Sequence, residues 1–457
     1  MTKRTRRTGK MGLLFFPAFD WAISPTHPER EERLLYTKDQ IVEEGVLDLD
    51  SIVEYAPRIA TDKDIARTHI CVPDVAAQAT EAHHIAAGGG LTLADAWMSG
   101  EIVNGFAIIR PPGHHAMRIV HGNRGFCNVH NEAVMVDYLR QRHGIRRVAI
   151  VDTDVHHGDG TQDIYYHDPD TLVIGLHQDG RTLYPGTGFV DELGGPGAFA
   201  RNINVPLPPG TGDQGVLDVI ERLVLPLLAD FQPEIVINSA GQDNHYSDPL
   251  AHMRVSAQGY ARLNEMLAPD LAVLEGGYSI QSALPYVNLG IILAMAGLNY
   301  DHVREPDYDP NALAQPAELS DIVRRTIDWL RSAWERPQAA FQRAYPCLGE
   351  TYVREKGIFY DTDGIHEQQQ ETVRICGKCP GWLRIDSRAR GGRFGARRVW
   401  AMAIPWAACE HCADEARAQY QSMVRNPGAS YNWIYLQDRL IDQYHRYEPA
   451  TGRELVL

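Results

Sequence analysis

The densest group of side chains able to do chemistry is the segment DTDVHH, which contains Asp152, Asp154 and His156. If residues 148–154 form a strand, these three side chains point to one face, because strand side chains alternate with period two. A carboxylate and an imidazole two residues apart can take two positions on one zinc ion, and Asp243 is the best candidate for a third ligand. Three protein ligands leave one position open, as a catalytic zinc site requires. The alternative is a set of strand-end caps and loop hydrogen bonds.

Two tandem histidines, His114 and His115, follow an Arg-Pro-Pro-Gly turn. An imidazole titrates near neutrality and suits the roles of general base and general acid. Each ring needs an orienting partner on its second nitrogen, and Asp152 and Asp159 can provide it. Read alone, the pair is equally compatible with ordinary loop histidines. Its position beside the predicted metal ligands favours the catalytic interpretation.

A tyrosine follows two glycines in the segment EGGY, where Gly277 precedes Tyr278. Glycines allow a tight backbone turn, which would bring the phenol to the mouth of a site. A phenol can donate a hydrogen bond to a developing oxyanion. A turn tyrosine packed on the surface is the alternative.

Five short apolar runs must position these groups. Each is rich in Val, Ile or Leu without alternation, as expected for strands buried on both faces of a parallel sheet; they cover residues 105–110, 148–152, 172–177, 235–240 and 271–274. Helix candidates lie between or after them at 131–143, 215–231 and 256–267. This alternation predicts an α/β fold with right-handed crossovers. A polar cluster follows every run, and ligands bind outside the carboxyl ends of such strands, so we expect one shared crevice.

The chain is predicted to divide into a basic tail (1–10), a catalytic domain (11–345), a linker (346–370) and a C-terminal domain (371–457). Residues 301–320 resemble a long loop, 318–341 a helix, and 345–370 show little periodicity. The tail has five basic residues in ten, which predicts either disorder or contact with nucleic acid or another anionic surface.

Two C-x-x-C pairs mark the C-terminal domain: Cys376, Cys379, Cys409 and Cys412. Four thiolates at this spacing predict a structural zinc site in a ribbon-like unit, with buried free cysteines as the alternative. Between the pairs, residues 384–398 hold six arginines, at 384, 388, 390, 393, 397 and 398. They could bind nucleic acid or an acidic partner, or form a solvated hairpin.

The bulk composition narrows the class of protein. The 457 residues carry a net charge of −15, which argues against a protein whose main role is to grip nucleic acid. There is no apolar run of the roughly 18 to 20 residues that span a bilayer, and no secretory signal pattern. We therefore expect a cytoplasmic protein without membrane contact.

Seven stretches together resemble the arginase–deacetylase superfamily, specifically the histone deacetylase and acetylpolyamine amidohydrolase branch, in a class II-like form. They occur in family order: HPEREERL (27–34), GFAIIRPPGHHA (105–116), GFCNVHNEA (125–133), VDTDVHHGDGTQ (151–162), LYPGTG (183–188), SAGQDNHYSDPL (239–250) and LEGGY (274–278). The resemblance implies a three-layer α/β/α fold and zinc-dependent hydrolysis of an N-acyl amide, in acetyl-lysine or an acetylated polyamine or small amine.

The resemblance also implies residue roles. Asp154, His156 and Asp243 would bind zinc, His115 would act as general base and acid with Asp159, and His114 with Asp152 would act electrostatically. Tyr278 would polarise the acyl carbonyl. Phe126, Tyr184 and Gly277 would wall the substrate channel. A structural potassium ion would lie near Asp152, Asp154 and His156, held by carbonyls that include those of Gly175 and Leu176.

Some residues depart from the family pattern. The loop that usually supplies an aspartate to clamp the substrate backbone has His69 and no acid, and Gln242 and Tyr184 replace more apolar residues. Three other functions stay open: a catalytically silent acyl-amine binding module, an arginase-like hydrolase, and a specialised hydrolase whose target is presented by the C-terminal unit. The residues leave the oligomeric state and the choice of zinc or iron(II) undecided.

Overall fold

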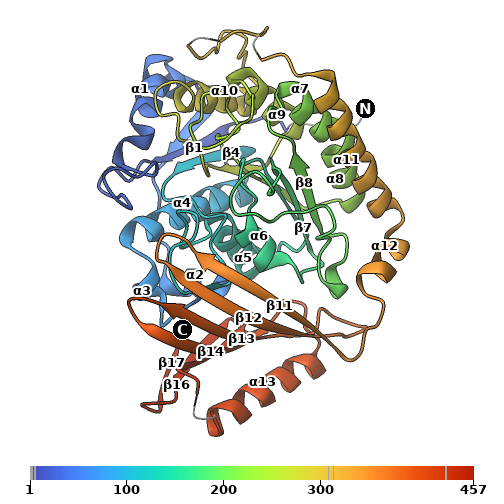
Figure 1. Ribbon diagram of the computed structural model, residues 1–457. Coiled ribbons are helices and arrows are strands. Elements are labelled where there is room, and N and C mark those ends of the chain that lie inside the picture. Colours follow the sequence, from blue (N-terminus) through green and yellow to red (C-terminus); the bar gives the residue numbers. More distant parts are fainter. Residues whose placement is uncertain (1–3, 5–6, 307, 312, 428–429) are drawn as a thin grey trace.

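The computed structural model describes residues 4, 7–306, 308–311, 313–427 and 430–457 (Figure 1). Five of the ten residues of the predicted basic tail lie outside the described residues. Within that tail, Arg4 forms an ion pair with Asp270 at 2.5 Å, which ties it to the core. Among the described residues, none of the helices combines the length and the apolar character needed to cross a membrane.

The centre of the catalytic domain is an eight-stranded sheet in which every neighbouring pair is parallel. Its order is β2 (Ile52–Tyr55), β1 (Met11–Phe16), β4 (Asn104–Ile109), β10 (Leu271–Val273), β9 (Ile235–Ser239), β6 (Val148–Asp152), β7 (Thr171–Gln178) and β8 (Asn202–Leu207). The five predicted runs all become strands of this sheet. Their continuous burial agrees with the absence of alternation in the sequence.

Helices cover both faces of the sheet and bury two separate apolar cores, so the predicted α/β architecture is confirmed. One face carries α1 (Leu35–Glu43), α7 (Asp213–Val219), α8 (Leu225–Phe231), α9 (Ala257–Leu267), α10 (Leu284–Ala296) and α11 (Ala317–Glu335). The other carries α2 (Asp62–Thr68), α4 (Glu81–Met98), α5 (Asn131–His143) and α6 (Asp159–Tyr165). The short α3 (Val75–Gln78) and the two-stranded sheet of β3 (Ile70–Cys71) and β5 (Ile119–Val120) complete this side.

Two predicted helices differ in detail from the structure. The helix expected at 318–341 is divided into α11 and α12 (Pro337–Ala344), because Pro337 cannot continue a helix and instead starts the next one. The helix expected at 215–231 contains a π-helical turn, Ile220–Val224, between α7 and α8. The predicted helix at 256–267 begins as expected, since the Ser256 side chain accepts a hydrogen bond from the backbone N–H of Gly259.

The predicted linker at 346–370 is wrong: most of it forms strands. A seven-stranded sheet runs in the order β11 (Thr351–Tyr360), β12 (Ile365–Arg374), β13 (Leu383–Gly391), β14 (Gly395–Ile404), β15 (Trp433–Asp438), β16 (Gln443–Glu448) and β17 (Arg453–Val456). Helix α13 (Glu410–Arg425) packs on it. Strand β11 exposes much of its surface and therefore lacks the apolar signature of a buried strand. The unit is accordingly larger than the ribbon predicted at 371–457 and begins near residue 351.

The C-terminal unit shares a core with the catalytic domain. Ile70 and Ile119 of the domain pack in one buried cluster with Leu383 and Val399 of the unit. The two parts lie directly against each other, with β11 to β14 crossing below α2 and α3 (Figure 1). The hydroxyl of Tyr360 donates a hydrogen bond to the carbonyl of Ile119 at 2.8 Å. The structure therefore holds the unit in place by apolar packing and by polar contacts.

Candidate active site

The structure brings together the three predicted metal ligands Asp154, His156 and Asp243 at the carboxyl ends of β6 and β9. One ligand atom from each lies within 4.8 Å of the other two. His156 Nδ1 is 3.1 Å from Asp154 Oδ1 and 3.1 Å from Asp243 Oδ2. Both carboxylates are buried, and backbone N–H groups of Gly276 and Val155 bind their other oxygens. Burial and the negative charge of the nearby Asp154 raise the pKa of Asp243. Two carboxylates this close favour binding of a cation between them. The donor set fits a divalent metal ion.

His114 lies behind this trio. Its Nδ1 is 3.1 Å from Asp152 Oδ2, and its Nε2 is 3.8 Å from Asp154 Oδ1. The ring is buried, which by itself lowers the pKa, but Asp154 and Asp152 outweigh burial and raise the pKa of His114 well above its usual value. The structure thus contains the predicted His114–Asp152 pair. The two carboxylates favour the protonated, positively charged form of the His114 ring.

His115 forms the second predicted pair. Its Nδ1 is 2.7 Å from Oδ1 of Asp159, a residue at the start of α6. The other ring nitrogen, Nε2, is not used by this contact. Arg124 donates to the second oxygen of Asp159, through Nε at 2.8 Å and through Nη2. Burial and the neighbouring His114 lower the pKa of His115 to about 3, so the imidazole is neutral. The resulting chain Arg124–Asp159–His115 fixes the ring, and sequence reasoning did not find the arginine.

Tyr278 is placed by a glycine turn and a buried charge network. Gly277 has a φ of +124°, where an L side chain would be strained. The Arg33 guanidinium lies 5.1 Å from the Tyr278 ring and donates to the Gly277 carbonyl at 2.7 Å. Glu29 Oε2 accepts from Arg33 at 2.8 Å, and Glu29 Oε1 accepts from Arg110 at 2.6 Å. The network holds the turn, while burial raises the pKa of Tyr278 and keeps its hydroxyl protonated.

A cavity of about 240 Å³ joins these groups. Its walls include His115, His156, Tyr278 and the predicted channel residues Phe126 and Tyr184. Phe126 and Tyr278 meet edge to face with ring centroids 5.6 Å apart, and His115 and Tyr184 do so at 5.3 Å. One predicted wall residue differs: Gly276 lines the cavity in place of Gly277, whose carbonyl faces Arg33.

The sequence analysis missed Asp361, which lines this cavity from the turn between β11 and β12. Its Oδ1 accepts hydrogen bonds from the Tyr184 hydroxyl and from the Gly125 backbone N–H, each at 2.9 Å. Two turn residues further, Asp363 Oδ2 accepts from the Asn123 N–H at 2.7 Å. Local sequence signals could not find Asp361, because it lies in the segment predicted to be a linker.

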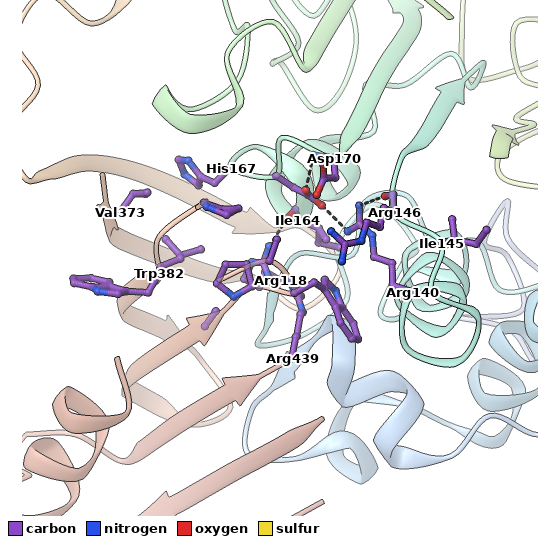
Figure 2. A pocket seen from close by; sticks show the side chains of 18 residues that line it. Arg118, Arg140, Ile145, Arg146, Ile164, His167, Asp170, Val373, Trp382 and Arg439 are labelled. Atoms are coloured by element: carbon purple, nitrogen blue, oxygen red, sulfur yellow. Dashed lines mark hydrogen bonds and ion pairs between the residues drawn. The ribbon is translucent and has the colours of Figure 1, made fainter. Parts of the chain in front are cut away.

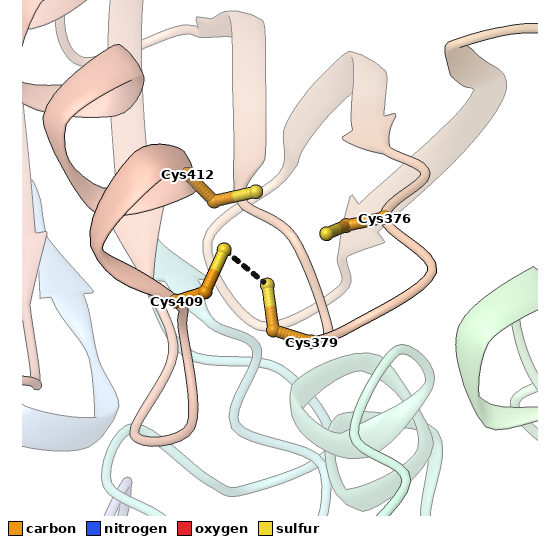
Figure 3. Close-up of side chains that lie close together, drawn as sticks. All are labelled: Cys376, Cys379, Cys409 and Cys412. Carbon is orange, nitrogen blue, oxygen red and sulfur yellow. Dashed lines mark hydrogen bonds between the residues drawn. The ribbon is translucent and has the colours of Figure 1, made fainter.

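The four cysteines of the two C-x-x-C pairs also meet. Their Sγ atoms lie within 4.8 Å of one another, and those of Cys379 and Cys409 are 3.5 Å apart (Figure 3). Cys376 and Cys379 come from the loop between β12 and β13, whereas Cys409 and Cys412 begin α13. Hydrogen bonding lowers the pKa of Cys376 to about 7, toward the thiolate form. The donor set suits a tetrahedral structural metal.

The arginine-rich segment forms the β13–β14 hairpin. Asp386 neighbours two of its arginines, with oxygens 3.6 Å from Arg388 Nε and 3.5 Å from Arg398 Nη2. Arg397 lies 3.6 Å from the centroid of the Phe394 ring. Acidic and aromatic neighbours thus occupy several of these side chains, and nucleic-acid binding by the hairpin stays a prediction.

Comparisons with known proteins identify the family of this chain. A model of the histone deacetylase domain matches residues 73–289. A probable deacetylase of Archaeoglobus fulgidus is 42% identical over 318 residues, 64% of this chain and 87% of that protein. A histone deacetylase-like amidohydrolase of Pseudomonas aeruginosa is 36% identical over 260 residues, 55% of this chain and 67% of that protein. The crystal structure of the HDA15 HD domain has a TM-score of 0.63 at 28% identity, and the match covers 75% of this chain and 100% of that one.

The fold and the site define a metal-dependent amidohydrolase that acts on linear amides. The chain belongs to the histone deacetylase family.

Proposed function

We propose that the protein hydrolyses the N-acyl amide of an acylated amine and releases the free amine. The observation that carries the proposal is that one cavity is lined by His156, His115 and Tyr278. His156 lies against Asp154 and Asp243 in the candidate metal site, and His115 is paired with Asp159. A zinc ion held by the trio would polarise the amide carbonyl and acidify a water molecule.

The protein's own residues supply the proton transfers. Because Asp159 engages Nδ1 of His115, Nε2 is the nitrogen able to accept a proton from water and return it to the departing amine. The neutral state of His115 leaves that nitrogen free to act as a base. The protonated hydroxyl of Tyr278 can donate a hydrogen bond to the acyl oxygen as it gains negative charge. Phe126 and Tyr184 line the cavity and offer aromatic surface against which the acyl chain would pack.

The acid at the cavity wall supports a proposal for the substrate class. Asp361 places a carboxylate beside Tyr184, where the amine part of a substrate would enter. A carboxylate there favours a substrate with a further cationic group, such as an acetylated polyamine, over a neutral acyl amide. The loop at His69 offers no acid, and His69 itself is buried, with its Nδ1 2.8 Å from the Met117 carbonyl. Asp361 therefore supplies an acid at the cavity that this loop lacks.

A potassium site near Asp152 is part of the proposal. Gly175 lies opposite Asp152 in the register of β6 and β7, so its neighbour Leu176 and the acid lie in one region of the sheet. Activity measured in potassium and in tetramethylammonium salts at equal ionic strength tests this site. Equal rates would argue against it.

The function is tested by turnover of acetyl-lysine peptides and acetylpolyamines, with metal content measured in the same samples. Tyr278→Phe should retain its metal and lose about 100-fold or more in kcat, because one donor to the oxyanion is removed. Tyr286→Phe, a half-buried tyrosine of α10 away from the cavity, is the matched control. A metal-loaded wild type that turns over no member of the panel would refute the proposal and favour a silent binding module.

A further inference from the structure

A second cavity, of about 230 Å³, lies between the catalytic domain and the C-terminal unit, away from the candidate active site. The end of α5, the end of α6 and the strands and loops around β13 and β14 form its walls. Figure 2 shows Arg118 and Arg439 in the middle, with His167 and Trp382 to one side and Arg140 and Arg146 to the other. The exposed residues Gly144, Arg146 and Ala407 border its opening.

The guanidinium of Arg118 is buried without a counter-ion. Only 6% of Arg118 is exposed, and among the described residues no carboxylate lies within 4.0 Å of its side chain. Its Nη atoms donate to the Gln437 side chain and the Ile164 carbonyl, and its Nε finds no acceptor there. Its neighbour Asp163 instead forms an ion pair with Lys356. A buried cation that contacts no carboxylate is costly, so an anion from outside would complete the site.

Other donors at the cavity are also unengaged within the described part of the chain. Nη2 of Arg439, which is 7% exposed, has only a distant ion pair with Asp137 at 3.6 Å. The indole Nε1 of Trp406 is buried without a hydrogen-bond partner. Two guanidinium groups at one cavity, those of Arg118 and Arg439, suit the binding of an oxyanion.

The charge and shape of the cavity define the ligand further. Four arginines and two aspartates line it, and Asp168 is already bound by Arg140 at 2.6 Å. The cavity is thus locally basic in a chain whose net charge is −15. Burial and the nearby Arg439 lower the pKa of Arg118 to about 10, and the more distant carboxylates of Asp163, Asp137 and Glu371 offset this only in part. Apolar walls from Trp382, Pro380 and Leu383 leave room for more than a bare ion.

We propose that this cavity binds a small organic anion, with a phosphate or carboxylate group on Arg118 and Arg439 and an apolar body against Trp382 and Trp406. The site joins the two parts of the chain, so its ligand would hold the C-terminal unit against the core. No part of the inference depends on the hydrolase activity.

The test is isothermal titration of the full chain with phenyl phosphate, benzoate and inorganic phosphate, at constant ionic strength in chloride. Phenyl phosphate or benzoate should bind at least tenfold more tightly than inorganic phosphate, and the preferred probe identifies the head group. Arg118→Met should weaken that binding tenfold or more, whereas Arg325→Met, on the exposed face of α11, should leave it unchanged.

Trp406→Leu keeps the test valid if Arg118→Met does not fold, since Trp406 is only partly buried. It should weaken phenyl phosphate several-fold, because both the aromatic wall and the indole N–H are lost, and inorganic phosphate less, because only the N–H matters for it. Absence of heat with all three probes at about 10 mM, or equal affinities in the wild type and both cavity variants, would overturn the proposal.

Discussion

The Asp361 carboxylate accepts a hydrogen bond from the Tyr184 hydroxyl at 2.9 Å, which joins a turn of the C-terminal unit to the wall of the active-site cavity. The unit therefore forms part of the cavity wall and is also a neighbour of the catalytic domain. The contact links a residue of the channel wall to one that is 177 positions later in the chain.

Asp361→Asn should change substrate selectivity. It keeps an acceptor for Tyr184 and removes the negative charge, so kcat/KM for acetylpolyamines should fall about tenfold while that for a neutral acetamide changes less than about twofold. Asp363→Asn alters the same turn without touching the cavity and should leave both values unchanged. Equal losses for charged and neutral substrates would show that Asp361 acts only on the shape of the wall.

Asp159→Asn should disable the base. The amide cannot stabilise a protonated His115 as a carboxylate does, and it leaves the Arg124 guanidinium uncompensated. We expect kcat to fall by about 100-fold to 10⁴-fold with metal content unchanged. Asp191→Asn, an exposed position, serves as the control. A loss of less than about fivefold would remove Asp159 from the proton-transfer machinery.

Metal analysis should give two zinc ions per wild-type chain. The double variant Cys409→Ser/Cys412→Ser should retain one zinc ion, because serine hydroxyls bind zinc much more weakly than the two thiolates they replace. Without its metal, the C-terminal unit should become sensitive to proteases. Activity toward acetylpolyamines should fall with it, since Asp361 would lose its position. Cys71→Ser, a buried cysteine outside the cluster, is the control for thiol loss. Two zinc ions in the double variant would disprove the four-cysteine site.

Glu132 should make the protein less stable as pH rises from about 5 to 8. Burial raises the pKa of Glu132 from 4.5 to about 7 in the folded chain. Between these values the unfolded chain has lost a proton that the folded chain keeps, so the stability present below pH 4.5 is lost by about pH 7.

Between pH 5 and pH 8, the free energy of unfolding of the wild type should fall by about 2–3 kcal/mol more than that of Glu132→Gln. The reason is that a glutamine at this position cannot titrate. Urea unfolding at both pH values measures the difference. Glu335→Gln, exposed at the end of α11, should behave like the wild type. Identical pH dependence in Glu132→Gln and the wild type would show that Glu132 is ionised in the folded chain.

The sequence identified the strands that hold the chemistry but not all of the sheet. Runs such as 148–152 are uniformly apolar, and burial on both faces leaves that mark in any parallel strand. Strands β1, β2 and β8 were not predicted. In β8, Asn202, Asn204 and Pro206 interrupt the apolar pattern. The side-chain N–H groups of the two asparagines donate to Gln162, a residue distant in the chain.

The sequence by itself determined the chemistry: the types and order of Asp154, His156, Asp243, His115 and Tyr278, and the four cysteines. Carboxylates and imidazoles at strand ends carry that information locally, because the parallel sheet brings every carboxyl end to one edge. Only the tertiary structure decided that Asp361 enters the channel and that Arg118 is buried between the two parts of the chain. Both depend on how the C-terminal sheet docks, and contacts between residues hundreds of positions apart leave no local periodicity in the sequence.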